Sequence, residues 1–137
     1  MTDPRLIGKR ILIVDDDQDI LGAIDLVMRA EGATTEMVAD GNAALAACQS
    51  VAPDAVVLDM MLPKQSGFLV LERIKAGPRP PVVVMITANQ GKRHVAYAES
   101  LGVDAYLTKP VPLERLIDTL VRLLPGNGQG ALSEPAS

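Results

Sequence analysis

Aromatic residues are nearly absent from this sequence of 137 residues, which has one phenylalanine, two tyrosines and no tryptophan. Its core must therefore be built from aliphatic side chains, and the hydrophobic fraction of 48% is large enough to supply them. The charged fraction of 22% is close to the globular average and excludes a disordered chain. The length is that of one domain, so a second catalytic or DNA-binding domain has no room.

Cysteine is represented by Cys48 alone, which excludes an internal disulfide and gives no Cys-x-x-Cys zinc pattern. No apolar run is long enough to span a bilayer, and residues 1–9 lack the apolar stretch of a signal peptide. We therefore expect a chain that stays in the reducing cytoplasm. Its 13 basic residues are outnumbered by 17 acidic ones, and the net charge of −4 disfavours nucleic acid or an anionic membrane as a direct partner.

Apolar segments that predict β-strands recur five times, and most of them are as continuous as strands buried on both faces require. They cover Arg10–Asp15, Thr35–Val38, Ala55–Asp59, Pro81–Thr87 and Asp104–Thr108. Apolar residues at helical spacing follow each strand, and the most amphipathic set lies within Leu113–Leu124. This alternation predicts an α/β fold with a parallel sheet and helices on both of its faces.

Composition divides the chain into a lead over residues 1–8, a domain over 9–124 and a tail over 125–137. The tail holds three glycines, two prolines and two serines, which predicts a flexible segment or the stub of a linker. Within the domain, Asp17 or Asp19 is expected to cap the first helix. We expect Cys48 in the core and His94 on the surface.

Polar residues with chemical potential fall where the strands end. Asp15 and Asp16 lie at the carboxyl end of the first strand, Asp59 ends the third, Thr87 ends the fourth and Lys109 follows the fifth. Parallel α/β sheets bind ligands at this edge. Three converging carboxylates repel one another and therefore call for a cation, and oxygen ligands select a hard ion such as Mg²⁺.

Strict alternation along the first strand would send Asp15 and Asp16 to opposite faces, so we expect the strand to end at this point. Lys109 supplies a compact positive charge for an oxyanion, and Thr87 supplies a hydroxyl for a phosphoryl oxygen. A carboxylate can itself be phosphorylated in covalent catalysis. Taken singly, each of these residues also has an ordinary interpretation as a helix cap, a turn acid or a packed strand residue.

Together, four segments resemble the signature segments of response-regulator receiver domains. They are Ile13–Asp17, Leu58–Pro63 with Gly67, Ile86–Ala88 and Leu107–Pro110, within a resemblance that covers about residues 9–124. The resemblance implies a flavodoxin-like (βα)₅ fold with strand order 2-1-3-4-5. It also implies a signalling domain of two-component phosphorelays rather than an enzyme, in which Asp59 receives a phosphoryl group from a histidine kinase or phosphotransfer protein with Mg²⁺ present.

The same resemblance assigns roles to single residues. Asp16 and Asp59 would bind Mg²⁺ directly and Asp15 mostly through water, while the backbone carbonyl of Met61 would complete the protein ligands. Lys109 would bridge Asp59 and the phosphoryl group, and a cis peptide bond is expected before Pro110.

Receiver domains signal through a switch, which here would use Thr87 and Tyr106. The surface altered would be formed by residues 95–101, the fifth strand and residues 113–121, and a downstream protein would bind there. Met61 and Asn89 would flank the path of attacking water. Because neither is a good general base, we expect the domain to lose its phosphoryl group slowly.

Other classes of protein fit less well. A phosphohydrolase of the aspartyl-phosphate type usually has a second acid two residues after the nucleophile, where this chain has Met61. A flavin-binding module would need phosphate-binding hydroxyls and aromatic residues near the first loop, where Asp15–Asp17 would repel phosphate. A phosphorylation-dead receiver is disfavoured because every signature position is filled. The receiver half of a truncated DNA-binding regulator stays open, because the tail resembles a linker.

Overall fold

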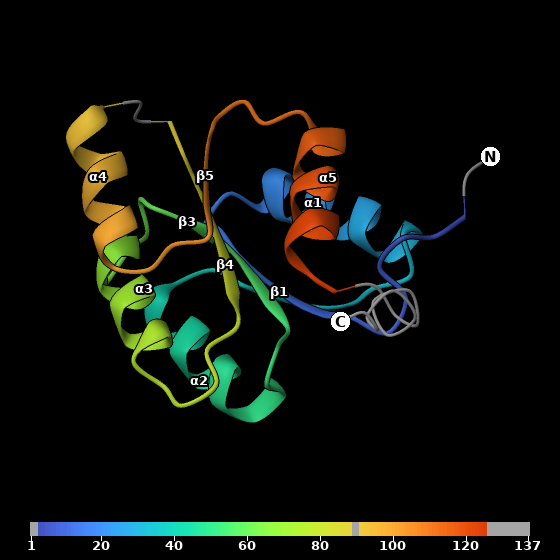
Figure 1. The fold of residues 1–137 in the computed structure, drawn as a ribbon, viewed down its shortest axis with the longest axis horizontal. Coiled ribbons are helices and arrows are strands. Elements are labelled where there is room, and N and C mark those ends of the chain that lie inside the picture. The colour runs from blue at the N-terminus through green and yellow to red at the C-terminus, as the bar shows by residue number, and fades with distance from the viewer. Residues whose placement is uncertain (1–2, 89–90, 126–137) are drawn as a thin grey trace, which may run out of the picture.

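A computed structural model describes residues 3–88 and 91–125 of the chain. Within them strands and helices alternate five times (Figure 1). The elements are β1 (Arg10–Val14), α1 (Gln18–Ala30), β2 (Thr34–Val38), α2 (Gly41–Val51), β3 (Ala55–Asp59), α3 (Gly67–Lys75), β4 (Val82–Thr87), α4 (Lys92–Ser100), β5 (Ala105–Thr108) and α5 (Leu113–Leu123). The predicted strands and helices are therefore confirmed, with boundaries that shift by a few residues.

The strands form one parallel sheet in the order β2-β1-β3-β4-β5, as predicted. β3 is the central strand, and all five of its residues are buried, including the terminal Asp59. β1 and β4 flank it, so the carboxyl ends of these three strands lie at one edge. This order brings the acidic residues after β1 within reach of the acid at the end of β3.

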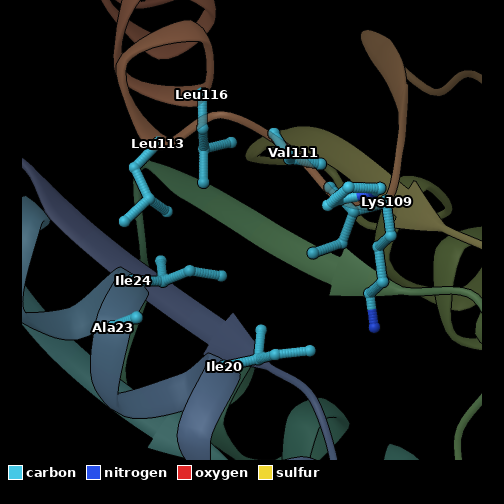
Figure 2. A pocket seen from close by; sticks show the side chains of 9 residues that line it. Ile20, Ala23, Ile24, Lys109, Val111, Leu113 and Leu116 are labelled. Atoms are coloured by element: carbon cyan, nitrogen blue, oxygen red, sulfur yellow. The ribbon is translucent and has the colours of Figure 1, made fainter.

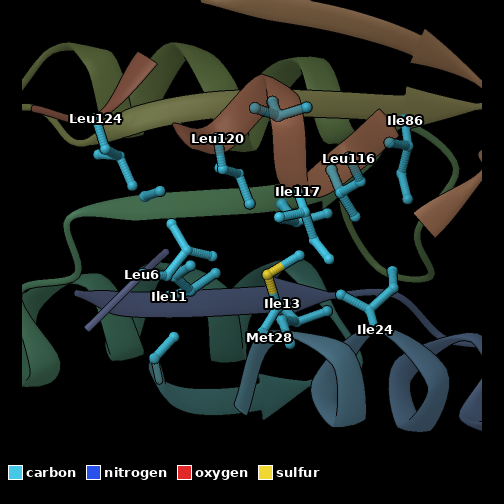
Figure 3. Close-up of a cluster of buried hydrophobic side chains, with 14 of the residues drawn as sticks. Leu6, Ile11, Ile13, Ile24, Met28, Ile86, Leu116, Ile117, Leu120 and Leu124 are labelled. Atoms are coloured by element: carbon cyan, nitrogen blue, oxygen red, sulfur yellow. The ribbon is translucent and has the colours of Figure 1, made fainter. Parts of the chain in front are cut away.

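Side chains alternate along the central strands between two aliphatic clusters. In β1, for example, Ile11 and Ile13 join one cluster, whereas Leu12 and Val14 join the other. The first cluster is covered by α1 and α5 (Figure 3), and we call this side the α1/α5 face. The second cluster is covered by α2, α3 and α4, and we call it the α2/α3/α4 face.

The lead before β1 packs into the domain, which its sequence did not indicate. Leu6 is 1% exposed and belongs to the cluster of the α1/α5 face. Arg5 forms ion pairs with Glu31 just after α1 and with Glu114 and Asp118 of α5. This segment therefore joins the carboxyl end of α1 to α5.

Side-chain caps fix where several helices begin. Asp17, one of the two predicted caps, accepts hydrogen bonds from the backbone N–H groups of Asp19 and Ile20. Asp40 and Ser66 cap α2 and α3 in the same way. In the part of the chain that the structure describes, no helix has the length and apolar character needed to cross a membrane. The predicted tail lies outside the described residues, apart from residue 125.

Candidate functional site

Three aspartates meet at the carboxyl edge of the sheet. Asp59 is the last residue of β3 and is 3% exposed, and Asp15 directly after β1 is fully buried. Asp16 is exposed, yet one carboxylate oxygen from each of the three residues lies within 4.8 Å of the others. The structure therefore brings together the three acids that the sequence proposed as metal ligands.

The end of β1 explains how neighbouring acids reach one pocket. The strand stops at Val14, and Oδ1 of Asp15 accepts a hydrogen bond of 2.9 Å from the N–H of Asp17. This local bond turns the chain toward the N-terminus of α1, so the two-residue alternation of a strand no longer applies to Asp16.

Lys109 adds a positive charge to the cluster. Its Nζ lies 3.0 Å from Oδ2 of Asp15 and 3.4 Å from Oδ2 of Asp59. The backbone N–H of Lys109 donates to the carbonyl of Thr87 at 2.7 Å, which extends the pairing of β4 and β5 to this residue. The peptide bond between Lys109 and Pro110 is cis, as predicted.

Burial and neighbouring charge set the protonation of the site. Burial, together with the charge of Asp15, raises the pKa of Asp59 to about 6, although the Met61 N–H and Lys109 oppose the shift. Burial alone would lower the pKa of Lys109, but its hydrogen bond to Asp15 and the charge of Asp59 outweigh burial and raise it. The carboxylates thus repel one another even with an ammonium beside them.

This donor set fits a hard divalent cation. Three carboxylates and one ammonium leave two uncompensated negative charges when all four groups are ionised. The available ligand atoms are oxygens, and two of the three carboxylates are buried. Oxygen ligands of this kind suit Mg²⁺ and are poor ligands for soft metals.

Thr87 and Tyr106 lie together beside the acidic cluster, on the other face of the sheet. Thr87 is fully buried at the end of β4, and its hydroxyl donates to Sδ of Met60 at 3.7 Å. The hydroxyl of Tyr106 donates to the same sulfur at 3.7 Å. Burial raises the pKa of Tyr106, while a hydrogen bond with the Thr87 side chain opposes the shift. The sequence proposed Thr87 and Tyr106 as a pair but did not identify Met60.

Four further residues were singled out in the sequence, namely Met61, Cys48, His94 and Asn89. The Met61 side chain is 65% exposed, while its N–H donates to Oδ1 of Asp59 at 3.2 Å. Cys48 is half-buried against the cluster of the α2/α3/α4 face. His94 was expected on the surface but is half-buried, because its ring stacks on Phe68 with the ring centroids 6.0 Å apart. Asn89 lies outside the described residues.

An apolar groove of about 500 Å³ opens beside the charged cluster, between α1 and the segment that leads into α5 (Figure 2). Lys109 lies at one end of it, as Figure 2 shows. The residues that line the groove are Ile20, Ala23, Ile24, Ile86, Lys109, Pro110, Val111, Leu113 and Leu116. The site therefore has an apolar surface at its entrance on the α1/α5 face.

Comparison with known proteins identifies the family. The sequence profile of the response regulator receiver domain matches residues 11–121, which is most of the chain. The chain belongs to the response regulator receiver domains. Receiver domains are the phosphorylation-activated switches of two-component signalling, and they interact with histidine kinases and downstream effectors.

Several receiver proteins are similar to this chain. The DNA-binding response regulator MtrA of Mycobacterium tuberculosis is 37% identical over 109 residues, which are 80% of this chain and 47% of MtrA. The Regulator of RpoS of Escherichia coli is 40% identical over 112 residues, 81% of this chain and 33% of that protein. The chain thus spans between a third and half of these relatives.

Solved structures agree with the fold. A CheY-like receiver domain protein from Methanospirillum hungatei superimposes with a TM-score of 0.79 at 30% identity, covering 84% of this chain and 92% of that one. The chemotaxis response regulator CheY4 of Vibrio cholerae gives the same TM-score at 26% identity, with 85% and 98% covered. The flavodoxin-like receiver fold is therefore confirmed.

Proposed function

We propose that Asp59 accepts a phosphoryl group from a phosphohistidine of a histidine kinase or phosphotransfer protein. The observation that carries this proposal is a buried carboxylate on the central strand, with Lys109 and two further carboxylates around it. In the reaction a P–O bond forms to a carboxylate oxygen of Asp59 while the P–N bond of the donor breaks. The donor histidine nitrogen keeps the electron pair of the broken bond.

The reaction would require Mg²⁺, held by the carboxylates of Asp15, Asp16 and Asp59 and by the backbone carbonyl of Met61. When bound, the ion supplies charge neutralisation for the transferring oxygens. Lys109 would bind a phosphoryl oxygen, and the position of its ammonium, 3.0 Å from Asp15 and 3.4 Å from Asp59, supports this role. The N–H of Met61 holds one oxygen of Asp59 and orients the carboxylate.

Incubation with Mg²⁺ and acetyl phosphate tests the acceptor. Intact mass spectrometry should find one added phosphoryl group on the wild-type protein and none on the variant Asp59→Asn. Asp54→Asn is a matched control, because Asp54 is an exposed aspartate at the opposite end of β3. Full phosphorylation of Asp59→Asn would overturn the assignment.

The apolar groove supports a docking surface for the phosphodonor. A donor must bring its phosphohistidine to Asp59, and the groove ends at Lys109, which contacts Asp59. We therefore assign the groove to a donor surface on which apolar side chains surround the phosphohistidine. A charge in the groove, as in Ala23→Glu, should slow transfer from a phosphohistidine-bearing domain and leave phosphorylation by acetyl phosphate unchanged. Equal slowing with both donors would argue against a docking role.

Phosphorylation would then alter the surface of α4, β5 and α5, where a downstream protein would bind. The phosphoryl group carries roughly two negative charges, in place of the one on the Asp59 carboxylate, and brings three acceptor oxygens beside Thr87. Its capture of the Thr87 hydroxyl would change the surroundings of Tyr106, which is hydrogen-bonded with Thr87. A difference of a few kcal/mol between two positions of the ring is enough to invert their populations.

The domain would act as a signalling unit that catalyses only its own phosphorylation and a slow dephosphorylation. The exposed side chain of Met61 offers no general base to attacking water, which supports a slow loss of the phosphoryl group. We place this unit at residues 9–124, after a lead of 1–8 and before a tail of 125–137. Cytoplasmic location is part of the proposal, since receiver domains take their phosphoryl groups from kinases there.

A second candidate is the receiver half of a DNA-binding regulator. It is favoured by MtrA, which is named a DNA-binding response regulator and of which the chain spans about half. In that case the effect of phosphorylation would pass to another domain. The chain by itself has a net charge of −4, so we expect no retention of duplex DNA in a mobility-shift assay.

A further inference from the structure

Two hydroxyl groups share one acceptor directly after the proposed phosphoacceptor. Sδ of Met60 lies 3.7 Å from the hydroxyl of Thr87 and 3.7 Å from the hydroxyl of Tyr106, in position to accept from both. Because the two hydroxyls also hydrogen-bond with each other, the single Thr87 proton serves either the sulfur or the Tyr106 oxygen at one time. Met60 is 5% exposed and lies in the cluster of the α2/α3/α4 face, against which Tyr106 also packs. The sulfur therefore connects a residue of β4 to a residue of β5.

The backbone of Met60 is held on two sides. Its N–H donates to the carbonyl of Ile86 at 3.0 Å, and its carbonyl accepts from the N–H of Gly67 at 2.8 Å. Gly67 approaches so closely that a Cβ on it would lie 2.6 Å from the Cα of Met60. Because Met60 follows Asp59 in the chain, its side chain starts from a fixed point one residue from the phosphoacceptor.

Alternation places the two neighbours on opposite faces of the sheet. Asp59 contacts Lys109 on the side of the α1/α5 face, whereas Met60 belongs to the cluster of the α2/α3/α4 face. A phosphoryl group on Asp59 and the hydroxyl of Tyr106 therefore lie on different sides of the central strand. Thr87 ends the neighbouring strand β4, one residue after Ile86, which pairs with Asp59 in the sheet register.

The chemistry of sulfur makes this contact easy to exchange. A thioether is a weak hydrogen-bond acceptor, whereas a charged phosphoryl oxygen is a strong one. The Thr87 hydroxyl, which reaches the sulfur and the Tyr106 hydroxyl, would therefore gain by turning to the charged phosphoryl group. The backbone of Met60 would stay in place on phosphorylation, so its sulfur could still accept a hydrogen bond from the Tyr106 hydroxyl.

We propose that Met60 is a positioning residue of the switch, whose sulfur keeps the Tyr106 hydroxyl inside the domain when Thr87 turns to the phosphoryl group. This inference rests on the proposed function, because it requires a phosphorylated Asp59. It adds a third residue to the proposed pair of Thr87 and Tyr106. Removal of the sulfur alone should release the Tyr106 ring toward solvent in the phosphorylated state.

NMR of protein with ¹³C-labelled tyrosine rings tests this proposal. The chain has two tyrosines, and the variant Tyr97→Phe assigns their signals. The variant Met60→Leu removes the acceptor and preserves volume, which cores tolerate well. Met85→Leu is the matched control, because Met85 is buried in the same cluster and pairs with Tyr106 in the register of β4 and β5.

Each protein is compared before and after treatment with Mg²⁺ and acetyl phosphate. In phosphorylated Met60→Leu, we expect the Tyr106 signal to move to the position of a solvent-exposed tyrosine, for which the protein unfolded in denaturant supplies the reference. Wild type and Met85→Leu should keep the Tyr106 signal distinct. A Tyr106 signal in phosphorylated Met60→Leu that coincides with that of wild type would overturn the proposal.

A second measurement uses the wild-type protein and does not depend on any variant folding. With the methionine methyl groups labelled, we expect a nuclear Overhauser effect between Met60 and the Tyr106 ring that is at least as strong in the phosphorylated protein as in the free protein, because phosphorylation favours the inward position of the ring. Its loss on phosphorylation would also refute the role of Met60. Intact mass distinguishes failure of the Met60 role from failure of the proposed function. Absence of an added phosphoryl group on the wild type would contradict the proposed function itself.

Discussion

The two faces of the sheet differ in the kind of group that they bring to the carboxyl edge. On the α1/α5 face the strands end in Asp15 and Asp59, which pair with Lys109. On the α2/α3/α4 face the corresponding groups are neutral, namely a thioether and the hydroxyls of Thr87 and Tyr106. Charged groups attract an ion and a phosphoryl group strongly, whereas neutral groups exchange partners at small cost. In the proposed function, phosphoryl transfer would therefore use the charged groups of the α1/α5 face, and the switch would use the neutral groups of the α2/α3/α4 face.

The largest expected effect is the loss of phosphorylation when the acidic cluster on the α1/α5 face lacks Mg²⁺. Chelation of Mg²⁺ by EDTA should stop phosphorylation by acetyl phosphate, because the carboxylates would then repel the incoming phosphoryl group. Asp16→Ala should also stop it. Relief of repulsion among the acids should in turn raise the thermal midpoint of the metal-free variant. Undiminished phosphorylation in excess EDTA, measured by intact mass, would count against a metal-dependent site.

Gly67 packs against the backbone of both Asp59 and Met60, so a substitution there should affect both faces of the sheet at once. A Cβ on Gly67 would lie 2.5 Å from the carbonyl oxygen of Asp59 and 2.6 Å from the Cα of Met60. We expect Gly67→Ala to lower the free energy of unfolding by about 2 kcal/mol or more and to impair both phosphorylation and the Tyr106 response. Chemical denaturation and intact mass measure the two effects.

Gly22 supplies the control for that substitution. It lies exposed within α1, and a Cβ there would have no heavy atom within 4 Å. Gly22→Ala should therefore stabilise the protein by about 0.5–1 kcal/mol, because alanine favours the helix. If Gly67→Ala and Gly22→Ala showed the same free energy of unfolding and the same phosphorylation, the close approach of Gly67 to Asp59 and Met60 would have no importance.

A change at Thr87 should remove the switch response of the α2/α3/α4 face and leave phosphorylation on the α1/α5 face intact. Thr87→Ala should still accept a phosphoryl group on Asp59 but lose most of the displacement of the Tyr106 signal and phosphorylation-dependent partner binding. Thr108→Ala is the control, because Thr108 pairs with Thr87 in the sheet register. If Thr87→Ala responds to phosphorylation as wild type does, the coupling of Thr87 to Tyr106 is wrong for this protein.

A smaller effect is expected at Met61, at the entrance of the charged site. We expect the phosphorylated wild type to last minutes or longer without a phosphatase. Met61→Asn would place a group that can hydrogen-bond attacking water and should shorten the lifetime severalfold. Mass spectra taken after removal of the donor measure the decay. Decay of the wild type within seconds would contradict the expectation.

The smallest effect is expected far from the carboxyl edge, at Arg5. Arg5→Ala should lower the thermal midpoint slightly, and less so at high salt, without changing phosphorylation. The hydrogen bond from Arg5 lowers the pKa of Glu31, so this contribution exists above the ordinary pKa of a glutamate and is lost as the pH falls through the lowered value. Midpoints of the two proteins should converge in acid. A difference that persists at low pH would exclude the Glu31 pair as its source.

Much of the fold follows from local patterns. Continuous apolar strands and amphipathic helices predicted all five strand–helix repeats, and the strand ends predicted where Asp15, Asp59, Thr87 and Lys109 lie. The roles of these residues stay predictions, although the structure brings their side chains to one edge. Alternation along β3 could also have indicated Met60, since it shares a face with Leu58.

Other features depend on contacts that no local pattern records. Leu6 and Ile7 stand side by side in the lead, yet Leu6 is buried in the cluster of the α1/α5 face while Ile7 is 54% exposed. His94 lies in a helix with a polar sequence, yet it stacks on Phe68 of α3. Both contacts join segments distant in the chain, and the residue types alone do not favour one partner over another.

The packing of the lead also has a consequence for the order of folding. The contact between Arg5 and Asp118 spans 113 residues, nearly the whole domain. Contacts of such long sequence separation require the largest loops to close, so they form after the local strand–helix repeats. During synthesis, residues near the start of the chain must wait for the last helix before they reach their final place. The lead is thus synthesised before the rest of the domain but is among its last segments to become ordered.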